Sequence, residues 1–308
     1  MKGIFAAVIT PCDQHGNIDI DRYVRHARWL LAHGCHGLGV FGTTSETNCY
    51  SVSERQAALE GYVEAGLDPA SMILGVGCCA RSDTVALAKH GLSLGVTRML
   101  VLPPFFYKNN SDEGLVRAYC DIIETVDDSR LDLYFYHFPQ VSQVPVTKPV
   151  IEALLKRYPG IVKGLKDSSG DWEHTRDLIE SFPSFEVFSG ADNHLLENLR
   201  MGGSGTISAA GNLNCAANRI VYDTFMDGDE LDSENAMEAV SAVRKIVSSF
   251  PLIPAIKHVV SHALDDPEWA RVRPPLVELD EQAGSDLLAR LGEAGFSFPV
   301  DDQMSATR

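Results

Sequence analysis

Short apolar runs alternate with amphipathic segments through the first 225 residues of the chain. Runs rich in Val, Ile, Leu and aromatic residues are typical of buried strands. They predict strands near residues 3–9, 36–41, 72–77, 98–102, 131–136, 161–166, 185–189 and 204–207. The segments between them have helical spacing, as in Val24, Ala27 and Leu31, and several begin at a cap-like residue such as Ser53 or Ser111. Eight strand–helix units predict an α/β fold, a (β/α)8 TIM barrel.

The pattern changes after residue 225, where strand signals stop. Residues 231–249, 254–264 and 281–293 have the spacing of helices. We therefore expect a barrel over residues 1–225 and a C-terminal helical extension over residues 226–308 that packs on it. No linker rich in Pro, Gly or Ser separates the two parts, so an independent second domain is not expected.

Composition narrows the class of protein. With 308 residues, 45% hydrophobic and 22% charged, the chain has enough apolar surface for a large core. A net charge of −16 disfavours nucleic acid and anionic membranes as partners. No apolar run approaches the roughly 20 residues of a membrane span, and the seven cysteines include no C-x-x-C pair. We expect reduced thiols and a cytoplasmic protein.

Lys166 is the strongest candidate for chemistry. It ends the apolar run 160–166 and precedes a polar stretch, so a strand delivers an ammonium group to its carboxyl end. Alternation predicts that Val162, Gly164 and Lys166 share the inner face of the barrel. Burial disfavours the charged form of an amine and so supplies the neutral nucleophile that attacks a carbonyl.

Other candidate residues lie at or just after the carboxyl ends of the predicted strands, at the face where barrels carry their active sites. These candidates are Thr43, Thr44, Tyr136, Gly190, Asp192, Ile207 and Ser208. Two threonine hydroxyls and adjacent backbone N–H groups are suited to hold the carboxylate of a 2-oxo acid. A tyrosine hydroxyl can exchange the protons that Schiff-base chemistry requires. Each residue alone has a structural explanation, as a turn, a core aromatic or a helix cap.

In this order, four motifs resemble the dihydrodipicolinate synthase / N-acetylneuraminate lyase family. They are residues 42–46 (GTTSE), 136–139 (YHFP), 164–167 (GLKD) and 205–208 (GTIS). The resemblance implies a homotetrameric barrel that forms a Schiff base with pyruvate at Lys166 and needs no metal or organic cofactor. It also implies that Tyr136 is the acid/base group and that Thr43 and Thr44 bind the pyruvoyl carboxylate.

Three departures bear on the substrate. The synthases of this family have an arginine two residues past the proline, where this chain has Val141, and valine makes no ionic contact. The segment ending in Phe106 and Tyr107 resembles the lyase branch, in which a tyrosine reaches a neighbouring subunit's site; we assign that catalytic role to Tyr107. Sialic acid lyases carry Asp-Glu where this chain has Asp192 and Asn193, so sialic acid is not favoured.

We therefore expect a class I aldolase-type lyase that uses pyruvate as substrate or product, together with an aldehyde or sugar acid. Reversible aldol cleavage or dehydration of a 2-keto-3-deoxy sugar acid is the favoured reaction. Gly190, Asp192 and Ser208 are then candidates to bind the sugar-acid tail. The alternative is 4-hydroxy-tetrahydrodipicolinate synthase, which condenses pyruvate with aspartate semialdehyde.

Three other functions have weaker support. Residues 75–80 match G-x-G-x-x-A, a dinucleotide-binding pattern, but no acidic residue follows at the spacing that a ribose contact requires. His258 and His262 lie one helical turn apart, but valine replaces the glutamate that a zinc hydrolase needs after the first histidine. A sensor or scaffold would leave the lysine, the tyrosine and the paired threonines without a role.

Overall fold

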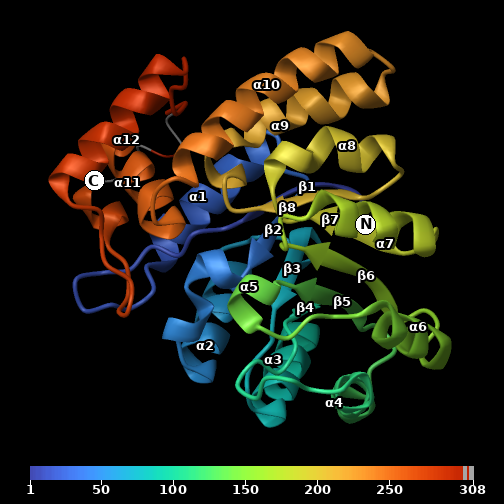
Figure 1. Ribbon diagram of the computed structural model, residues 1–308. Coiled ribbons are helices and arrows are strands. Elements are labelled where there is room, and N and C mark those ends of the chain that lie inside the picture. Colours follow the sequence, from blue (N-terminus) through green and yellow to red (C-terminus); the bar gives the residue numbers. More distant parts are fainter. Residues whose placement is uncertain (301–303, 305–308) are drawn as a thin grey trace.

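The computed structural model describes residues 1–300 and Met304. Parallel strands form a closed barrel in chain order, with β8 paired to β1 (Figure 1). The strands are β1 (Gly3–Ala7), β2 (Gly37–Val40), β3 (Met72–Gly75), β4 (Arg98–Val101), β5 (Asp132–His137), β6 (Val162–Asp167), β7 (Glu186–Ser189) and β8 (Gly205–Ser208). The predicted (β/α)8 barrel is confirmed.

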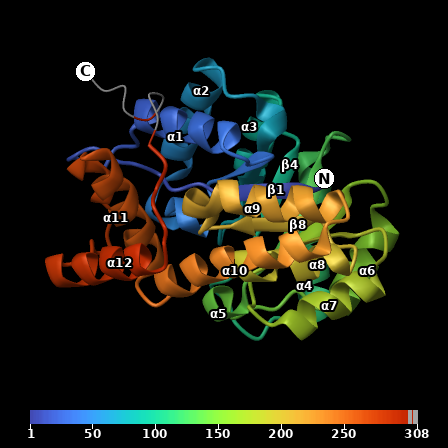
Figure 2. The same ribbon diagram turned by 90° about the horizontal axis from the view of Figure 1, so that it is seen from above.

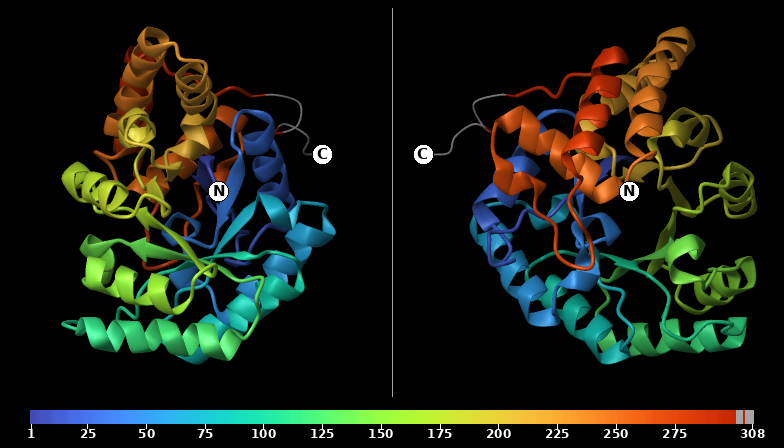
Figure 3. Two further views of the ribbon diagram at one scale, coloured as in Figure 1. Left: turned by 90° about the vertical axis from the view of Figure 1, so that its right-hand side faces the viewer. Right: turned by 60° about the vertical axis from the view of Figure 1, so that its left-hand side comes forward.

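Helices surround the strands (Figure 3). Those that connect them or follow β8 are α1 (Ile20–Ala32), α2 (Val52–Glu64), α3 (Arg81–Ser93), α4 (Asp112–Val126), α5 (Pro139–Ser142), α6 (Lys148–Arg157), α7 (Trp172–Ser181), α8 (Leu195–Arg200) and α9 (Gly211–Met226). Ser111 caps α4 as expected. The expected cap Ser53 is wrong, because Ser51 and Glu54 form a reciprocal capping box at the start of α2.

The barrel has two apolar layers. Side chains such as Phe5, Tyr134 and Phe188 fill its interior, whereas a larger cluster lies between strands and helices. The expected inward direction of Val162 is wrong, since it packs in the outer cluster. The pairing register of β5 and β6 shifts between Leu133 and Tyr134, and this bulge breaks the simple alternation along β6.

The C-terminal residues form α10 (Glu230–Val247), α11 (Leu252–Leu264) and α12 (Glu281–Glu293). These bounds lie within two residues of the predicted helices. Helix α10 runs beside α9 over the barrel, and α11 and α12 lie at one side of it (Figure 2). The expected boundary between residues 225 and 226 falls at the end of α9, and the division into two units stays a prediction.

Among the described residues, no single helix has the length and apolar composition of a membrane span. Helices α10 and α11 reach that length and composition only when taken together, and they meet at a bend of 109°.

Candidate active site

A cavity of about 370 Å³ opens at the carboxyl ends of the strands. Its wall includes barrel residues and residues of the C-terminal helices. The barrel supplies Thr43, Thr44, Tyr136, Phe138, Val141, Lys166, Ser168, Gly170, Gly190, Ala191 and Ala209, and the C-terminal segment supplies Arg244, Pro251, Leu252, Ile253, Pro254 and Leu276. The cavity therefore lies between the barrel rim and the helices that follow it.

Lys166 lies on the inner side of β6, and only 4% of it is exposed. It pairs in register with Tyr136 on β5, and its Nζ atom is 4.5 Å from the centre of the Tyr136 ring. Residues that pair in register on neighbouring parallel strands point to the same side of the sheet. The register thus brings the amine and the phenol together in the cavity, as the sequence predicted.

The Tyr136 hydroxyl lies 3.2 Å from Oγ1 of Thr43, so the two can exchange a proton. Thr43 belongs to a short 3-10 helix, η1 (Thr43–Ser45), that follows β2. The Ser45 hydroxyl donates to the carbonyl of Val8 at 2.6 Å and ties this turn to the end of β1. Amine, phenol and threonine hydroxyl therefore form one connected group from three strands.

The same turn offers donors for a carboxylate. The Ser45 N–H donates to the Gly42 carbonyl, and the Glu46 N–H donates to the Thr43 carbonyl. These are the first backbone hydrogen bonds of the turn. The N–H groups of Thr43 and Thr44 come before them in the chain and so have no partner within the turn. Together with the two hydroxyls they make a compact set of neutral donors.

The charged residue types of the cavity wall are all basic. Among the described residues that line it, Lys166 and Arg244 are basic, and none is Asp or Glu. Sequence reasoning missed Arg244, because a basic residue in the last turn of a helix is explained by the helix dipole alone. Only the packing of α10 against the barrel brings Arg244 to the site.

The structure brings Thr43, Thr44, Tyr136, Lys166 and Gly190 into one cavity wall. The Gly190 N–H donates to the Asp167 carbonyl at 2.6 Å, which joins the ends of β6 and β7. A β-carbon at position 190 would lie 2.1 Å from the Ser168 hydroxyl, so the close approach requires glycine.

Three other predicted side chains lie outside that wall. Asp192 is fully buried and accepts a hydrogen bond from Asn218 at 3.1 Å. Ile207 packs inside the barrel below the cavity. Ser208 pairs with Ala6 of the outer layer, so its side chain points away from the barrel axis. Substrate binding by these three residues stays a prediction.

Tyr107 also lies outside its own chain's cavity wall. It and Phe106 follow β4 in an exposed loop, with 74% and 71% of their surfaces accessible. The rings contact each other edge to face, and the Tyr107 carbonyl accepts a hydrogen bond from Asn110. The expected role of Tyr107 in a neighbouring subunit's site stays a prediction.

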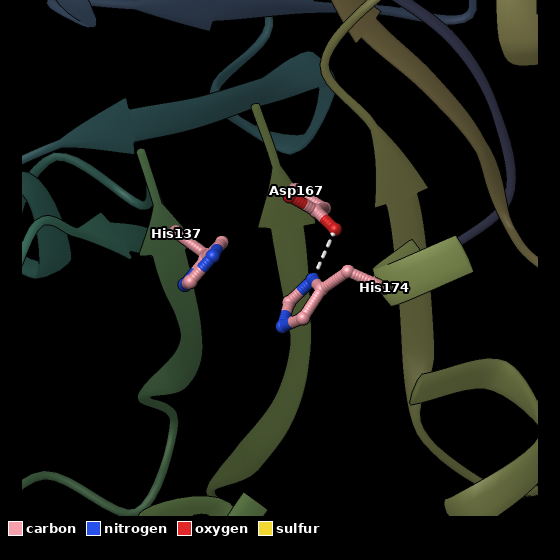
Figure 4. Close-up of side chains that lie close together, drawn as sticks. All are labelled: His137, Asp167 and His174. Carbon is pink, nitrogen blue, oxygen red and sulfur yellow. Dashed lines mark hydrogen bonds and ion pairs between the residues drawn. The ribbon is translucent and has the colours of Figure 1, made fainter. Parts of the chain in front are cut away.

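A largely buried polar cluster of three residues lies at the ends of β5 and β6 (Figure 4). His137 and Asp167 directly follow Tyr136 and Lys166 on their strands, and His174 comes from α7. His174 Nδ1 is 2.7 Å from Asp167 Oδ2, and the two imidazole rings stack with centroids 4.4 Å apart. The cluster joins the ends of β5 and β6 and so helps to hold Tyr136 and Lys166 in place.

Hydrogen bonds explain this cluster without a metal. One ligand atom from each residue lies within 4.8 Å of the others. However, the Asp167 oxygens accept from His174, Thr175 Oγ1 and the Ser169 N–H, and His137 Nδ1 accepts from the Val146 N–H. These acceptors already have donors, which is the arrangement of a structural network.

Burial and charge set the protonation of the cluster. Burial lowers the pKa of His137 to about 4, and the positive charge of His174 acts in the same direction. The hydrogen bond to Asp167 raises the pKa of His174. Burial opposes ionisation of Asp167, but hydrogen bonds from His174 and Ser169 lower its pKa below the ordinary value. A His137 that is neutral near neutral pH therefore stacks on the imidazole that is hydrogen-bonded to Asp167.

Packing explains the dinucleotide-like motif at residues 75–80 and the histidine pair on α11. A β-carbon at Gly75 would lie 2.2 Å from the Phe41 carbonyl oxygen, and one at Gly77 would lie 2.6 Å from the Leu102 nitrogen. These glycines allow close contact between neighbouring strand ends. His258 packs against α12, where a β-carbon at Gly284 would lie 2.5 Å from its ring. Neither motif needs a ligand to account for it.

Comparison with known proteins agrees with this arrangement. The profile of the dihydrodipicolinate synthetase family matches residues 1–294. An "uncharacterized DapA-like lyase" of Chloroflexus aurantiacus is 37% identical over 292 residues, which covers 94% of this chain and 95% of that protein. The 4-hydroxy-tetrahydrodipicolinate synthase of Rhizobium meliloti is 28% identical, with 96% of this chain and 98% of that protein covered.

The fold also agrees with that of a solved structure of this family. The crystal structure of dihydrodipicolinate synthase from Agrobacterium tumefaciens superimposes with a TM-score of 0.87 at 29% identity, covering 96% of this chain and 99% of that chain. Because the family profile covers the strands that carry Thr43, Tyr136 and Lys166, the resemblance seen in the motifs is confirmed. The chain belongs to the dihydrodipicolinate synthetase family and is a lyase of the class I aldolase type.

Proposed function

We propose that the chain forms a Schiff base between Lys166 and a 2-oxo acid, with pyruvate as substrate or product. The observation that supports this most directly is the position of Lys166. Its amine is buried against the Tyr136 ring, and that tyrosine's hydroxyl lies 3.2 Å from Thr43. A sheltered amine beside a proton donor is what carbonyl addition requires.

The proposed reaction has three stages: formation of the Schiff base, cleavage of the C3–C4 bond, and hydrolysis. The neutral amine adds to the C2 carbonyl of the 2-oxo acid, and the carbinolamine loses water to give an iminium. The C4 hydroxyl loses its proton, the C3–C4 bond breaks, and its electron pair moves to the iminium nitrogen to give an enamine and an aldehyde. Protonation of C3 and addition of water then release pyruvate and restore the amine.

Tyr136 and Thr43 carry the protons of these steps. The phenol gives a proton to the departing hydroxide of the carbinolamine and takes one from the C4 hydroxyl, with Thr43 as its hydrogen-bond partner. The donors of Thr43 and Thr44 hold the pyruvoyl carboxylate. The iminium is itself the electron sink, so the proposed reaction requires neither a metal nor an organic cofactor.

The favoured substrate is a 2-keto-3-deoxy sugar acid, undergoing reversible aldol cleavage or dehydration. Synthesis of 4-hydroxy-tetrahydrodipicolinate is the second candidate, and the name of the Rhizobium meliloti relative favours it. Val141, which lines the cavity and is 50% exposed, weighs against it. A valine offers no charge for the carboxylate of aspartate semialdehyde.

We also propose a homotetramer in the cytoplasm. Family resemblance and the exposed pair Phe106 and Tyr107 support assembly, with Tyr107 placed in a neighbouring subunit's site. Seven free cysteines among the described residues support a reducing compartment.

Borohydride reduction in the presence of pyruvate, followed by peptide mass mapping, tests the Schiff base. We expect one pyruvate-derived adduct, on Lys166, and none in Lys166→Met. Lys163→Met is the matched control, because Lys163 lies on the same strand but ion-pairs with Asp132 at 3.4 Å outside the cavity. An adduct on another lysine would reject the assignment.

A comparison of rates distinguishes aldol cleavage from the synthase reaction. Pyruvate release from 2-keto-3-deoxygluconate is compared with condensation of pyruvate and aspartate semialdehyde under one set of conditions. We expect release to be the faster reaction. Faster condensation would favour the synthase.

A further inference from the structure

Arg244 is a cation in the cavity wall whose own partner is missing. It lies in the last turn of α10 and lines the same cavity as Lys166. Its Nη1 atom is shielded from solvent and has no hydrogen-bond partner among the described residues. An unsatisfied buried donor on a charged group is costly, so such a group calls for a counter-charge.

A candidate partner inside the protein is Asp192. Arg244 acts on this carboxyl electrostatically, but no ion pair within 4.0 Å joins the two among the described residues. Burial raises the pKa of Asp192, which favours its neutral form, although Arg244 opposes the shift. Asn218 already donates to Asp192 Oδ2. Asp192 Oδ1, like Arg244 Nη1, has no hydrogen-bond partner among the described residues, so the two groups as they stand do not satisfy each other.

The surroundings of Arg244 limit what that ligand is. The wall next to it in sequence is apolar, with Pro251, Leu252 and Ile253. Lys166 is occupied by the iminium at C2, so among the described residues of the wall Arg244 is the basic side chain left for the distal end of the substrate. One guanidinium matches one carboxylate, in charge and in its paired donors. A phosphate dianion would keep an uncompensated charge against this apolar surface.

We propose that Arg244 binds a carboxylate at the C6 end of a 2-keto-3-deoxy sugar acid, so that the preferred substrate is a sugar diacid. The inference rests on the proposed function, because it assumes that Lys166 and the turn at Thr43 and Thr44 hold the pyruvoyl end. The inference assigns the distal end of the substrate to a helix of the C-terminal segment. Arg244 comes from α10, whereas the family's arginine position beyond Tyr136 holds Val141.

Three matched substrates test the proposal, each assayed for pyruvate release. They are 2-keto-3-deoxygluconate, its 6-phosphate, and the diacid with a carboxylate at C6. We expect the native enzyme to have its highest kcat/KM with the diacid. In Arg244→Met, the value for the diacid should fall roughly 10- to 100-fold, the worth of a charged hydrogen bond. The kcat/KM for 2-keto-3-deoxygluconate should change by less than about threefold.

Lys245→Met is the matched control. It removes one positive charge from the same helix end, but Lys245 is exposed and lies outside the cavity wall. We expect it to keep the native preference for the diacid. Arg244→Lys should recover part of that preference, because it restores the charge without the paired donors.

Borohydride trapping with pyruvate separates this inference from the proposed function and from misfolding. Trapping at Lys166 in both the native protein and Arg244→Met would show an intact site whose distal contact alone has changed. Loss of trapping in the native protein would reject the proposed function. With trapping intact, equal losses for all three substrates, or a preference for the phosphate, would overturn the assignment of Arg244 to a carboxylate.

Discussion

Lys257 and Glu46 form an ion pair whose side chains are both fully buried. Lys257 lies on α11, and Glu46 ends the turn that carries Thr43 and Thr44. Lys257 Nζ also donates to the Arg271 carbonyl at 2.6 Å, and Glu46 Oε2 accepts from the Arg273 N–H at 2.7 Å. The C-terminal segment therefore holds the proposed carboxylate-binding turn from outside the barrel.

Lys257→Met should destabilise the protein strongly. It leaves the Glu46 carboxylate buried without its counter-charge, and breaking one side of a buried pair costs about 3–5 kcal/mol. Removing both charges in Glu46→Gln with Lys257→Met should cost less than the single change, because no uncompensated charge remains. Urea denaturation monitored by circular dichroism gives both values.

The exposed pair of Arg117 and Glu113 on α4 is the control, with side chains 78% and 73% accessible. Arg117→Met should cost less than about 1 kcal/mol, as surface pairs do. Equal losses from Arg117→Met and Lys257→Met would contradict the bracing role of the buried pair.

Tyr136→Phe should impair proton transfer while leaving the site assembled. The substitution removes the hydroxyl that contacts Thr43 but keeps the ring beside Lys166. We expect kcat for pyruvate release to fall by about 10²- to 10⁴-fold, the range for loss of a general acid/base. The amount of borohydride-trapped adduct at long incubation should stay near the native level.

Tyr158→Phe is the comparison for that experiment. Its hydroxyl bonds Glu124 on the outer helices, far from the cavity wall. Its kcat should match that of the native protein. A similar loss in both variants would mean that removing any partly buried phenol disturbs the enzyme.

The barrel was predictable from sequence because parallel strands buried on both faces read as apolar runs. The positions of the rim residues were predictable for the same reason, since Lys166 and Tyr136 end such runs and Thr43 lies two residues after one. Simple alternation failed at Val162, where a one-residue register shift turns the side chain outward. A bulge of this kind has no local signal in β6.

Residues that depend on long-range packing escaped the sequence reasoning. Arg244 reads as an ordinary basic residue of a helix end, and only its position in the cavity wall gives it another meaning. Asp192 follows a strand in the expected way, yet the structure buries it with Asn218 of α9. Which polar residues reach a cavity is set by side-chain direction and by helices distant in the chain.

Asp167→Asn should weaken the polar cluster of His137, Asp167 and His174. The carboxylate accepts hydrogen bonds from the Ser169 N–H, His174 and Thr175, and an amide would turn a donor toward one of these donors. We expect a loss of about 1–3 kcal/mol in the free energy of unfolding. Asp177→Asn, at an exposed site on the same helix as His174, should cost less than 1 kcal/mol or so. Comparable losses would argue against the cluster as a support.

His26 should make the protein less stable in mild acid. Full burial lowers the pKa of this imidazole to about 4 from the ordinary 6.5, although its hydrogen bond with Asn212 opposes the shift. Between these values the unfolded chain binds a proton that the folded protein refuses, so stability present above pH 6.5 is lost as the pH falls toward 4. His137 has a similarly lowered pKa and acts in the same direction.

By linkage, His26 alone should lower the free energy of unfolding by about 2 kcal/mol between about pH 8 and pH 5. In His26→Phe, whose ring can still stack on Trp29, that part of the pH dependence should vanish and the part due to His137 should remain. Urea denaturation at the two pH values measures the difference, with the exposed His15→Gln as control. If His26→Phe keeps the full pH dependence of the native protein, the buried imidazole is not its source.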